Sequence, residues 1–398
     1  MPAEPSTTSD VDANTLWGDD WPEVRALWPL EPTVAHVNHG SYGAVPTPVL
    51  EEQQSWRDRM ETNPLRFLRR EAPAALVAAR AEVAAFLGAG PTSLAFVHNA
   101  TSGASTVFAA FPLEPGDAVL LTDHAYGAVR IAADRFAPQR GARVESVHLP
   151  LAADDDDVVD AVLGAVHQRT RLVVLDQVTS PTARRLPLVR LVPALQERGV
   201  AVLVDGAHAP GMLAVDLDRL GADFFVGTLH KWCCAPRGTG VLHAAERWRP
   251  VLRPLVASWG EDEGFPLAFD DTGTEDPSAW LSAPRALRVL EGLGLDRLRR
   301  HNVELAVAGQ LEVAAALHVP AADLPRDSGV SMQLVPLPEG VADTPAAAGA
   351  LQDRIGEQAA VEVAISSFDG RGYVRLSAHA YNAPADYRRL AADLPGLL

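Results

Sequence analysis

The sequence has one lysine, two cysteines and no long apolar run. Lys231 is the only lysine among the 34 Lys and Arg residues of this 398-residue chain, so arginine carries nearly all of the positive charge. Cys233 and Cys234 are neighbours in sequence, and neighbouring cysteines almost never bridge to each other. We therefore expect no disulfide framework and a reducing compartment, the cytoplasm. The Cys/His spacing of zinc sites is also missing, so we expect no metal.

Basic patches and membrane signals are missing as well. The formal net charge is −17 and no basic cluster interrupts it, which argues against nucleic acid and anionic membrane surfaces as partners. The N-terminal stretch is acidic and lacks the apolar segment of a signal peptide. No apolar run reaches the roughly 18 residues that a transmembrane helix needs. Hydrophobic residues nevertheless make up 47% of the chain, enough for a large buried core.

Short apolar runs alternate with helical patterns through most of the chain. Two helical patterns at 48–90 are broken by "NP", and the apolar runs that follow include "SLAFVHNA", "DAVLLTD", "RVESVHLP", "RLVVLDQV", "VAVLVDG" and "DFFVGTLH". Strands separated by helices in this way predict βαβ units and a mostly parallel sheet. "GVLHAAE" follows the last of these runs like the second strand of a hairpin.

A long helical pattern at 284–316 introduces a region of different character. The region that follows this helical pattern contains the short strand patterns "SMQLVPLP", "VEVAISSF" and "YVRLSAH" and two further helical patterns. We therefore expect an N-terminal arm at 1–35, a large α/β domain at 36–285 and a small α+β C-terminal domain at 286–398.

Polar and aromatic residues follow the predicted strands of the large domain. Ligands of open parallel sheets bind at the carboxyl ends of the strands. Thr101 and Ser102 open a helix after the first run, where free N–H groups and hydroxyls suit a phosphate; the alternative is ordinary helix capping. Tyr126 and Ser180 follow two later strands.

Asp205 ends the fully apolar run "VAVLV". A buried carboxylate is costly unless a cation or a strong donor faces it, so Asp205 predicts such a partner. The alternative is that Asp205 caps the segment that begins near residue 209. His208 lies three residues after Asp205.

Lys231 follows the apolar stretch "DFFVG" and precedes Trp232. Burial disfavours the charged form of an amine, so we expect a lowered pKa for Lys231. A neutral amine forms a Schiff base with an aldehyde, which arginine cannot do because it stays protonated. The alternative is that Lys231 is an ordinary surface residue.

A phosphate cradle, an aromatic face, a strand-end carboxylate and a buried amine together are the binding set of pyridoxal 5′-phosphate (PLP). A carboxylate beside the pyridine nitrogen keeps it protonated, so that the ring acts as an electron sink.

"VLVDGAHAPG" followed by "DFFVGTLHKW" resembles the class V aminotransferase family of fold type I PLP enzymes, in particular its isopenicillin N epimerase-like members. The resemblance implies that Lys231 is the aldimine lysine, that Asp205 pairs with the pyridine nitrogen and that His208 lies near the phenolic oxygen. It also implies cofactor contacts from Thr101, Ser102, Tyr126, Thr228, His230 and Thr274. Thr274 matches a residue that reaches the partner subunit's phosphate, which implies a homodimer with active sites at the interface.

The resemblance also implies a substrate side. Arg375 in "YVRLSAHAYN" matches the arginine that grips the substrate α-carboxylate, and a bidentate pair of this kind orients the bonds at Cα. Asn38 and His39 in "VNHGSYG" also fit the epimerase-like proteins, as substrate-side residues, as does Ser180. For the two residues of "VNHGSYG", the alternative is a simple glycine turn. For Arg375 it is a surface strand residue.

The implied reaction acts at Cα of an amino acid or a cysteine-derived conjugate of specialised metabolism, through a lysine aldimine and a quinonoid. Epimerisation and C–S β-lyase chemistry remain open at this point, followed by decarboxylation coupled to oxidative deamination and by transamination. Cysteine desulfurases need a mobile cysteine shortly before the position of Arg375, and none is present. Epimerisation needs a second acid or base, for which Tyr126, His39 and His124 are candidates. The contrasting class is a non-catalytic PLP-binding protein.

Overall fold

The computed structural model describes residues 21–325, 327 and 329–398, and the chain divides into two compact units. The large unit spans Tyr42–Leu295, and the small unit combines the residues up to Ser41 with Asp296–Leu398. Residues 1–20 of the expected N-terminal arm lie outside the described residues. From Trp21 onward the arm forms helix α2 (Trp21–Ala26) and strand β1 (Ala35–His36) of the small unit.

The large unit is built on a seven-stranded sheet. In spatial order its strands are β2 (Leu94–Val97), β8 (Gly240–Ala244), β7 (Phe224–Thr228), β6 (Ala201–Gly206), β5 (Thr170–Asp176), β3 (Ala118–Thr122) and β4 (Arg143–Val147). The last five are mutually parallel, whereas β8 runs antiparallel to both of its neighbours. This confirms the predicted α/β class, the mostly parallel sheet and the hairpin-like pairing of "GVLHAAE".

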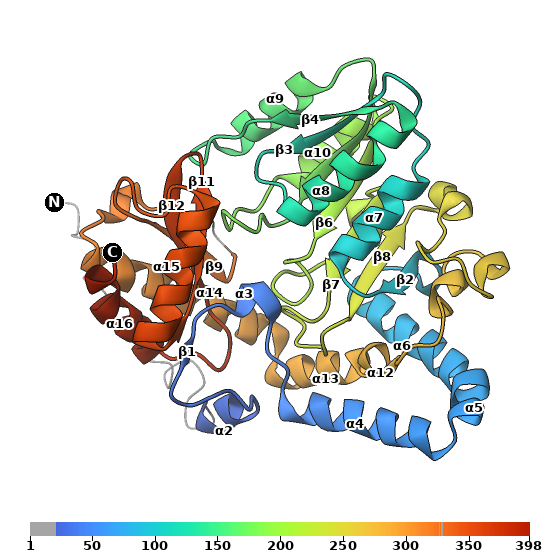
Figure 1. Cartoon of the computed structure of the whole chain (residues 1–398), viewed down its shortest axis with the longest axis horizontal. Coiled ribbons are helices and arrows are strands. Elements are labelled where there is room, and N and C mark those ends of the chain that lie inside the picture. The colour runs from blue at the N-terminus through green and yellow to red at the C-terminus, as the bar shows by residue number, and fades with distance from the viewer. Residues whose placement is uncertain (1–20, 326, 328) are drawn as a thin grey trace. The chain divides into compact units, whose positions relative to one another are not determined.

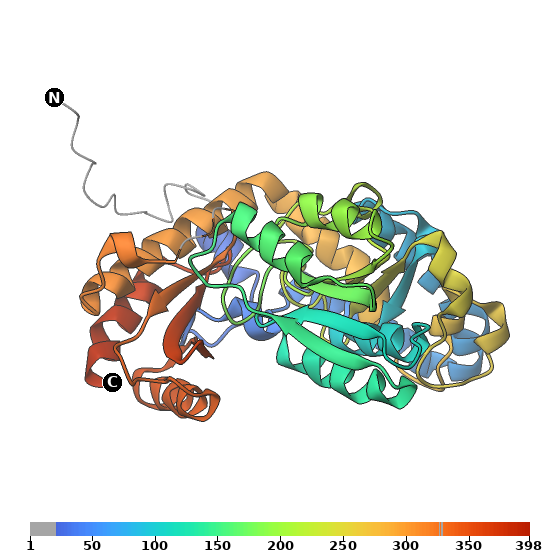
Figure 2. The same ribbon diagram turned by 90° about the horizontal axis from the view of Figure 1, so that it is seen from above.

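Helices cover both faces of this sheet (Figures 1 and 2). The helices of the large unit are α4 (Thr47–Thr62), α5 (Pro64–Arg66), α6 (Ala72–Phe86), α7 (Ala100–Ala110), α8 (Gly127–Phe136), α9 (Asp155–Ala165), α10 (Leu188–Gln196), α11 (Leu217–Leu220), α12 (Ser278–Leu281) and α13 (Ala283–Leu293), with a π-helical turn at Phe67–Glu71. Helix α4 ends at the predicted "NP" break, where the Asn63 side chain accepts the backbone N–H of Arg66 and so caps the next turn.

Strand alternation decides which side chains form the main core. Leu172 and Val174 of β5 and Leu203 of β6 belong to one buried cluster together with apolar residues of α7 and α8. Because side chains alternate between the two faces of a strand, every second residue of these strands points toward α7 and α8. The same alternation carries on to the strand ends, where the residues become polar.

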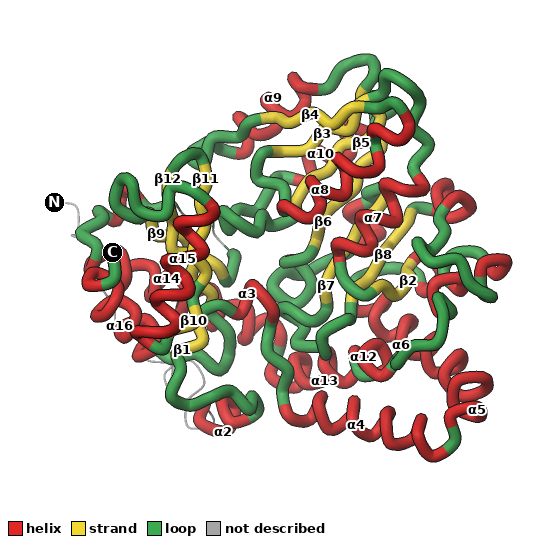
Figure 3. The backbone as a smooth tube through the Cα atoms, viewed as in Figure 1, coloured by secondary structure: helices red, strands yellow, loops and turns green. Residues whose placement is uncertain are grey.

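The small unit holds an antiparallel three-stranded sheet and a two-stranded parallel pair. The sheet order is β11 (Ala364–Phe368), β12 (Arg371–Ser377) and β9 (Met332–Pro336), and β1 pairs with β10 (Val361–Glu362). Helices α3 (His39–Tyr42), α14 (Leu295–Ala316), α15 (Pro345–Ala359) and α16 (Pro384–Asp393) complete the elements that lie wholly or mainly in this unit (Figure 3).

The helical pattern at 284–316 forms two helices rather than one. Gly294 separates α13 from α14 with a φ of +80°, a conformation that glycine adopts without strain. Among the described residues, no helix is long and apolar enough to cross a membrane.

Candidate active site

The carboxyl ends of the parallel strands carry the predicted carboxylate. Asp205 is the second-last residue of β6 and is 3% exposed. Its Oδ1 accepts a hydrogen bond from the backbone N–H of Ala207 at 2.9 Å. Burial raises the pKa of Asp205, whereas the Ala207 amide and the charge of Lys231 act in the opposite direction. Asp205 therefore lies within the electrostatic influence of the single lysine.

Lys231 lies in the turn that follows β7 and is 9% exposed. Its Nζ is 3.3 Å from Nε2 of His208 and 5.9 Å from the centre of the Tyr126 ring. The other ring nitrogen of His208, Nδ1, accepts the indole N–H of Trp232 at 3.2 Å. The structure thus brings Asp205, His208, Tyr126 and Lys231 together, as predicted from their places at strand ends.

Two glycines let the backbone approach the lysine turn closely. A Cβ at Gly43, where φ is +68°, would lie 1.9 Å from the carbonyl oxygen of His230 and 3.0 Å from Cα of Lys231. A Cβ at Gly211 would lie 2.3 Å from the carbonyl oxygen of Trp232. Gly43, the last glycine of "VNHGSYG", therefore packs against the peptide that precedes Lys231, where a larger residue would not fit.

Helix α7 presents its N-terminus on the same edge of the sheet. Asn99 is the N-cap and accepts the backbone N–H of Ser102 at 2.9 Å, while the Ser102 hydroxyl bonds back to Asn99. A Cβ at Gly240 would lie 2.7 Å from Cα of Asn99, and Gly240 pairs with Thr228 across β7 and β8. The start of α7 is therefore beside Thr228, with Thr101 partly exposed in its first turn.

Thr228 and His230 already have partners within the protein. The Thr228 hydroxyl donates to the Ala207 carbonyl at 2.7 Å, and His230 Nδ1 lies 3.3 Å from the Thr239 carbonyl. Burial, with a contribution from Lys231, lowers the pKa of His230 to about 4. A phosphate contact from Thr228 therefore requires its hydroxyl proton to leave the Ala207 carbonyl.

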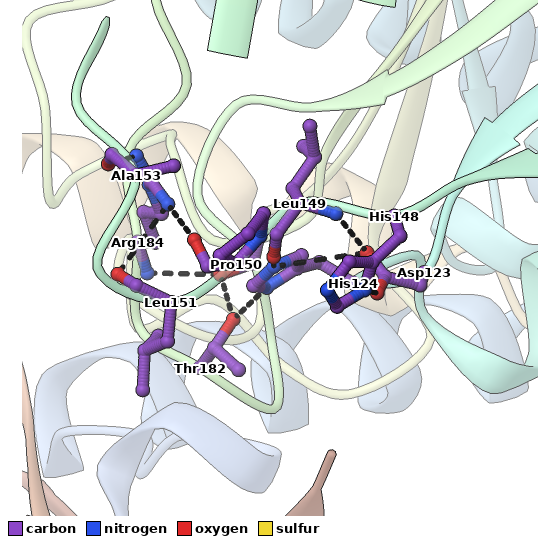
Figure 4. Close-up of polar contacts among 10 residues, drawn as sticks. Asp123, His124, His148, Leu149, Pro150, Leu151, Ala153, Thr182 and Arg184 are labelled. Carbon is purple, nitrogen blue, oxygen red and sulfur yellow. Dashed lines mark hydrogen bonds and ion pairs between the residues drawn. The ribbon is translucent and has the colours of Figure 1, made fainter. Parts of the chain in front are cut away.

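Ser180 lies in a turn after β5 that is fixed by hydrogen bonds among its neighbours. Figure 4 shows two of these neighbours, Thr182 and Arg184, with Thr182 beside His124. The Arg184 amide donates to Thr179 Oγ1 at 2.9 Å, and Thr179 and Thr182 share a bond of 2.6 Å. Thr182 in turn lies 2.6 Å from Nδ1 of His124.

His124 closes this chain and is fully buried. Its Nε2 lies 2.7 Å from the Leu149 carbonyl, which only accepts, so Nε2 carries the proton and Nδ1 accepts from Thr182. Burial lowers the pKa of His124. This geometry does not favour His124 as the second acid or base of an epimerisation, because both of its ring nitrogens are hydrogen-bonded within the protein.

Thr274 is exposed in the loop that precedes α12, and the neighbouring Glu275 lies 3.3 Å from His98. No other predicted site residue contacts it through a hydrogen bond in the described chain. Its expected contact with a partner subunit stays a prediction.

The small unit holds three of the predicted substrate-side residues, Asn38, His39 and Arg375, whereas Ser180 lies in the large unit. Arg375 lies on β12, is 5% exposed and donates from Nη2 to Asn38 Oδ1 at 3.3 Å and to Ser41 Oγ at 3.1 Å. His39 bonds to the Tyr381 hydroxyl at 2.9 Å. The structure thus groups Arg375, Asn38 and Ser41, and Arg375 lies on a central strand rather than on the surface.

The Aminotransferase class-V profile matches residues 43–390, which is most of the chain. The chain belongs to the class V aminotransferase family. Its cofactor is accordingly pyridoxal 5′-phosphate, as predicted, and the protein is an enzyme of this family.

The chain is similar in sequence to two curated relatives and shares its fold with a solved structure. It is 34% identical to isopenicillin N epimerase of Amycolatopsis lactamdurans over 95% of this chain and 98% of that protein. It is 30% identical to a probable chloroplastic L-cysteine desulfhydrase of Arabidopsis thaliana over 92% of this chain and 84% of that protein. The cysteine desulfurase CsdA of Escherichia coli shares the fold with a TM-score of 0.75 at 20% identity, covering 95% of this chain and 98% of that one. The predicted fold type I architecture is confirmed.

The residues of the large unit fit PLP. Asp205 is a buried carboxylate suited to a protonated ring nitrogen, the half-exposed Tyr126 ring is an aromatic face beside the lysine amine, and the N-terminus of α7 suits a phosphate dianion.

Several residues with notable contacts in the two units, each taken by itself, were not among the predicted site residues. They are Asp176, Thr179, Thr182 and the indole of Trp232 in the large unit, and Ser41 and Tyr381 in the small unit. Asp176 was the residue that the sequence could most readily have indicated, because it ends the apolar part of "RLVVLDQV" as Asp205 ends that of "VAVLVDG". The roles of the others depend on contacts between segments far apart in sequence.

Proposed function

We propose that this enzyme removes the Cα proton of an amino acid, with Lys231 as the base and, by forming the covalent link to PLP, as the residue that anchors the cofactor. The observation that carries the proposal is the position of Lys231 Nζ, 3.3 Å from His208 Nε2 and 5.9 Å from the Tyr126 ring centre. When bound, PLP supplies the electron sink that makes a Cα proton acidic. Lys231 is the only lysine available for this task.

Three sets of residues would hold the cofactor. Asp205 would pair with the ring nitrogen, His208 would face the phenolic oxygen and Tyr126 would stack on the ring. The first turn of α7, with Thr101 and Ser102, would bind the phosphate, joined by Thr228 and His230. In support, Asp205 and His208 are almost fully buried, so their hydrogen bonds to a ligand would be formed out of water.

Arg375 would bind the substrate α-carboxylate. Its Nη2 is held by Asn38 and Ser41, which leaves a planar guanidinium of fixed orientation in a buried setting. A guanidinium fixed in this way binds a carboxylate with defined geometry, which orients the bond to be broken at Cα. Asn38, His39 and Ser180 would complete the substrate side.

We infer that the preferred outcome of proton removal is isopenicillin N epimerase-like epimerisation of a cysteine-derived metabolite. This preference is supported by the epimerase of Amycolatopsis lactamdurans, which is similar over 95% of this chain. The second candidate is C–S β-lyase chemistry. The commitment of both nitrogens of His124 favours it, because a lyase needs no second acid at Cα.

One experiment separates these reactions. The purified holoenzyme is incubated in D₂O with a panel of α-amino acids and cysteine S-conjugates. Deuterium at Cα with inversion supports epimerisation, whereas pyruvate and a thiol support the lyase. CO₂ with an aldehyde, or a 2-oxo acid with PLP converted to its amine form, would contradict both, and no turnover of any substrate would favour a non-catalytic PLP-binding protein.

We also infer that the enzyme works as a homodimer in the cytoplasm. Trp259 is 95% exposed and Val256 57% exposed on one segment of the large unit, and large exposed apolar side chains of this kind mark association surfaces. Thr274, exposed a little further along the chain, would then reach the partner's cofactor phosphate. Cys233 and Cys234 are both buried thiols, which suits a reducing compartment.

A further inference from the structure

Asp176 is a second carboxyl group at the end of the sheet that carries Asp205. It is the last residue of β5, and its Cα is the register partner of Asp205 in the parallel pairing of β5 and β6. Leu172 and Val174, four and two residues earlier, point into the core beneath α7 and α8. Strand alternation therefore places Asp176 on the same face, beside Asp205.

The surroundings of Asp176 are dry and contain few donors. Asp176 is 2% exposed and Asp205 is 3% exposed. The backbone amides of Tyr126 and of Asp176 itself act to lower the pKa of Asp176, against the effect of burial. Its Oδ2 is buried, and among the described residues nothing forms a hydrogen bond to it. A buried carboxylate oxygen without a donor is costly, whereas a protonated oxygen carries no charge to solvate.

Two neighbouring carboxyl groups in such an environment do not both ionise. The pKa of Asp176 responds to the carboxyl group of Asp205 on β6 and to the backbone of Tyr126 at the start of α8. Lys231 acts to lower the pKa of Asp205. Burial and the Asp205 charge together raise the pKa of Asp176 well above its ordinary value.

We propose that Asp176 is held as a neutral carboxylic acid that leaves Asp205 as the single negative charge of the pair. Asp176 is a positioning residue, because it acts on the cofactor through Asp205. The inference rests on the proposed role of Asp205. Its consequence is that the carboxylate facing the ring nitrogen is not repelled by a second charge on the adjacent strand.

The test is infrared spectroscopy of the holoenzyme, because the C=O stretch of a protonated carboxyl group is resolved from that of a carboxylate. We expect the wild-type protein to show a protonated-carboxyl band at pH 7 that is lost in Asp176→Asn. The absence of such a band in the wild-type protein, or its full retention in Asp176→Asn, would overturn the proposal. The wild-type spectrum shows whether a protonated carboxyl group is present, even where the variant does not fold.

Cofactor binding supplies a second readout. Asparagine is neutral and close to aspartic acid in size, so Asp176→Asn should bind PLP within about threefold of wild type. A large loss of PLP affinity in Asp176→Asn would show that the charge of Asp176 matters and would contradict a neutral acid.

Asp205→Asn separates this inference from the proposed function. Without the neighbouring charge, the band of Asp176 should disappear at a lower pH than in wild type, and an unchanged midpoint would contradict the coupling of the two groups. If Asp205→Asn bound PLP with an unchanged absorbance spectrum, the proposed role of Asp205 would fail, whereas the infrared assignment of Asp176 would stand on its own.

Discussion

Trp232 donates its indole N–H to Nδ1 of His208 across 3.2 Å. Nδ1 is therefore an acceptor, so a neutral His208 carries its proton on Nε2, which lies 3.3 Å from Lys231 Nζ. The residue directly after the lysine thus fixes the tautomer of the histidine that faces it. A donor is in this way directed at the lysine amine, which favours the uncharged amine that a nucleophile requires.

Replacing Trp232 by Phe should release this constraint. A buried acceptor that loses its donor costs about 1–3 kcal/mol, so we expect activity to fall about tenfold and the visible absorbance of the holoenzyme to titrate at a different pH. Trp280→Phe is the matched control, because the buried Trp280 indole donates to the Val97 carbonyl at 3.3 Å and has no bond to His208. If the absorbance titration were unchanged in Trp232→Phe, or shifted equally in the control, Trp232 would not be the residue that fixes the tautomer of His208.

Replacing Lys231 should abolish both the cofactor absorbance of a covalent link and catalysis. We expect Lys231→Ala to lose about 10³-fold or more in kcat, because base and nucleophile disappear together. Lys231→Arg keeps the positive charge but stays protonated, so it should lose as much. Activity and absorbance spectra measure both effects. Retention of the wild-type spectrum in either variant would remove Lys231 from the proposed role.

Replacing Gly43 by Ala should destabilise the large unit strongly. The new Cβ would meet the His230 carbonyl oxygen at 1.9 Å in a backbone with φ of +68°, so strain and overlap add to about 3 kcal/mol or more. Gly238→Ala is the control, since φ is +86° there and no atom lies within 4 Å of the added carbon. It should cost about 1 kcal/mol. Urea unfolding of both variants measures the difference, and equal losses would contradict the close approach.

Acid should destabilise the protein through its buried histidines. Burial lowers the pKa of His243 and of His301 to about 4. The unfolded chain therefore takes up these protons first, near its ordinary pKa of about 6.5, so stability is complete above that pH and falls as the pH drops toward 4. Each group contributes about 3 kcal/mol over this range. His243→Gln should make the pH dependence of the unfolding free energy shallower, and an unchanged slope would be inconsistent with this view.

Replacing Trp259 by Glu should dissociate the proposed dimer. Trp259 is 95% exposed in the single chain, so the change should leave the fold intact and act on association alone. Light scattering after gel filtration should give twice the 42.4 kDa chain mass for the wild type and the chain mass for the variant. Val189→Glu, at an apolar residue of α10 that is 81% exposed, is the control. A monomeric wild type would contradict the proposal.

Much of the fold followed from local sequence patterns. Apolar runs such as those of β5 and β6 are buried on both faces, and parallel strands of this kind stand out between amphipathic helices. The division at Gly294 was missed, because α13 and α14 have a similar helical pattern and the break depends on one residue with positive φ. Local pattern thus identified the elements but not every point where they end.

The candidate site could be predicted where chemistry depends on residue type and strand position. Asp205, His208 and Lys231 lie at or just after strand ends, and the parallel sheet brings such ends together. Contacts that depend on tertiary packing could not be read in this way. Neither the bond of Thr182 to His124 nor that of Ser41 to Arg375 has a local sequence signal, because each joins segments that meet only in the fold.

The burial of the sole lysine has a practical consequence for chemical studies of this enzyme. Apart from the α-amino group of the chain, Lys231 is its only primary amine, and 9% of it is exposed. Amine-directed reagents therefore find almost no target on the outer surface. Because PLP would occupy this amine in the holoenzyme, a side-chain label that such a reagent leaves on the PLP-free protein reports on the interior of the site, and site-selective labelling needs no mutagenesis.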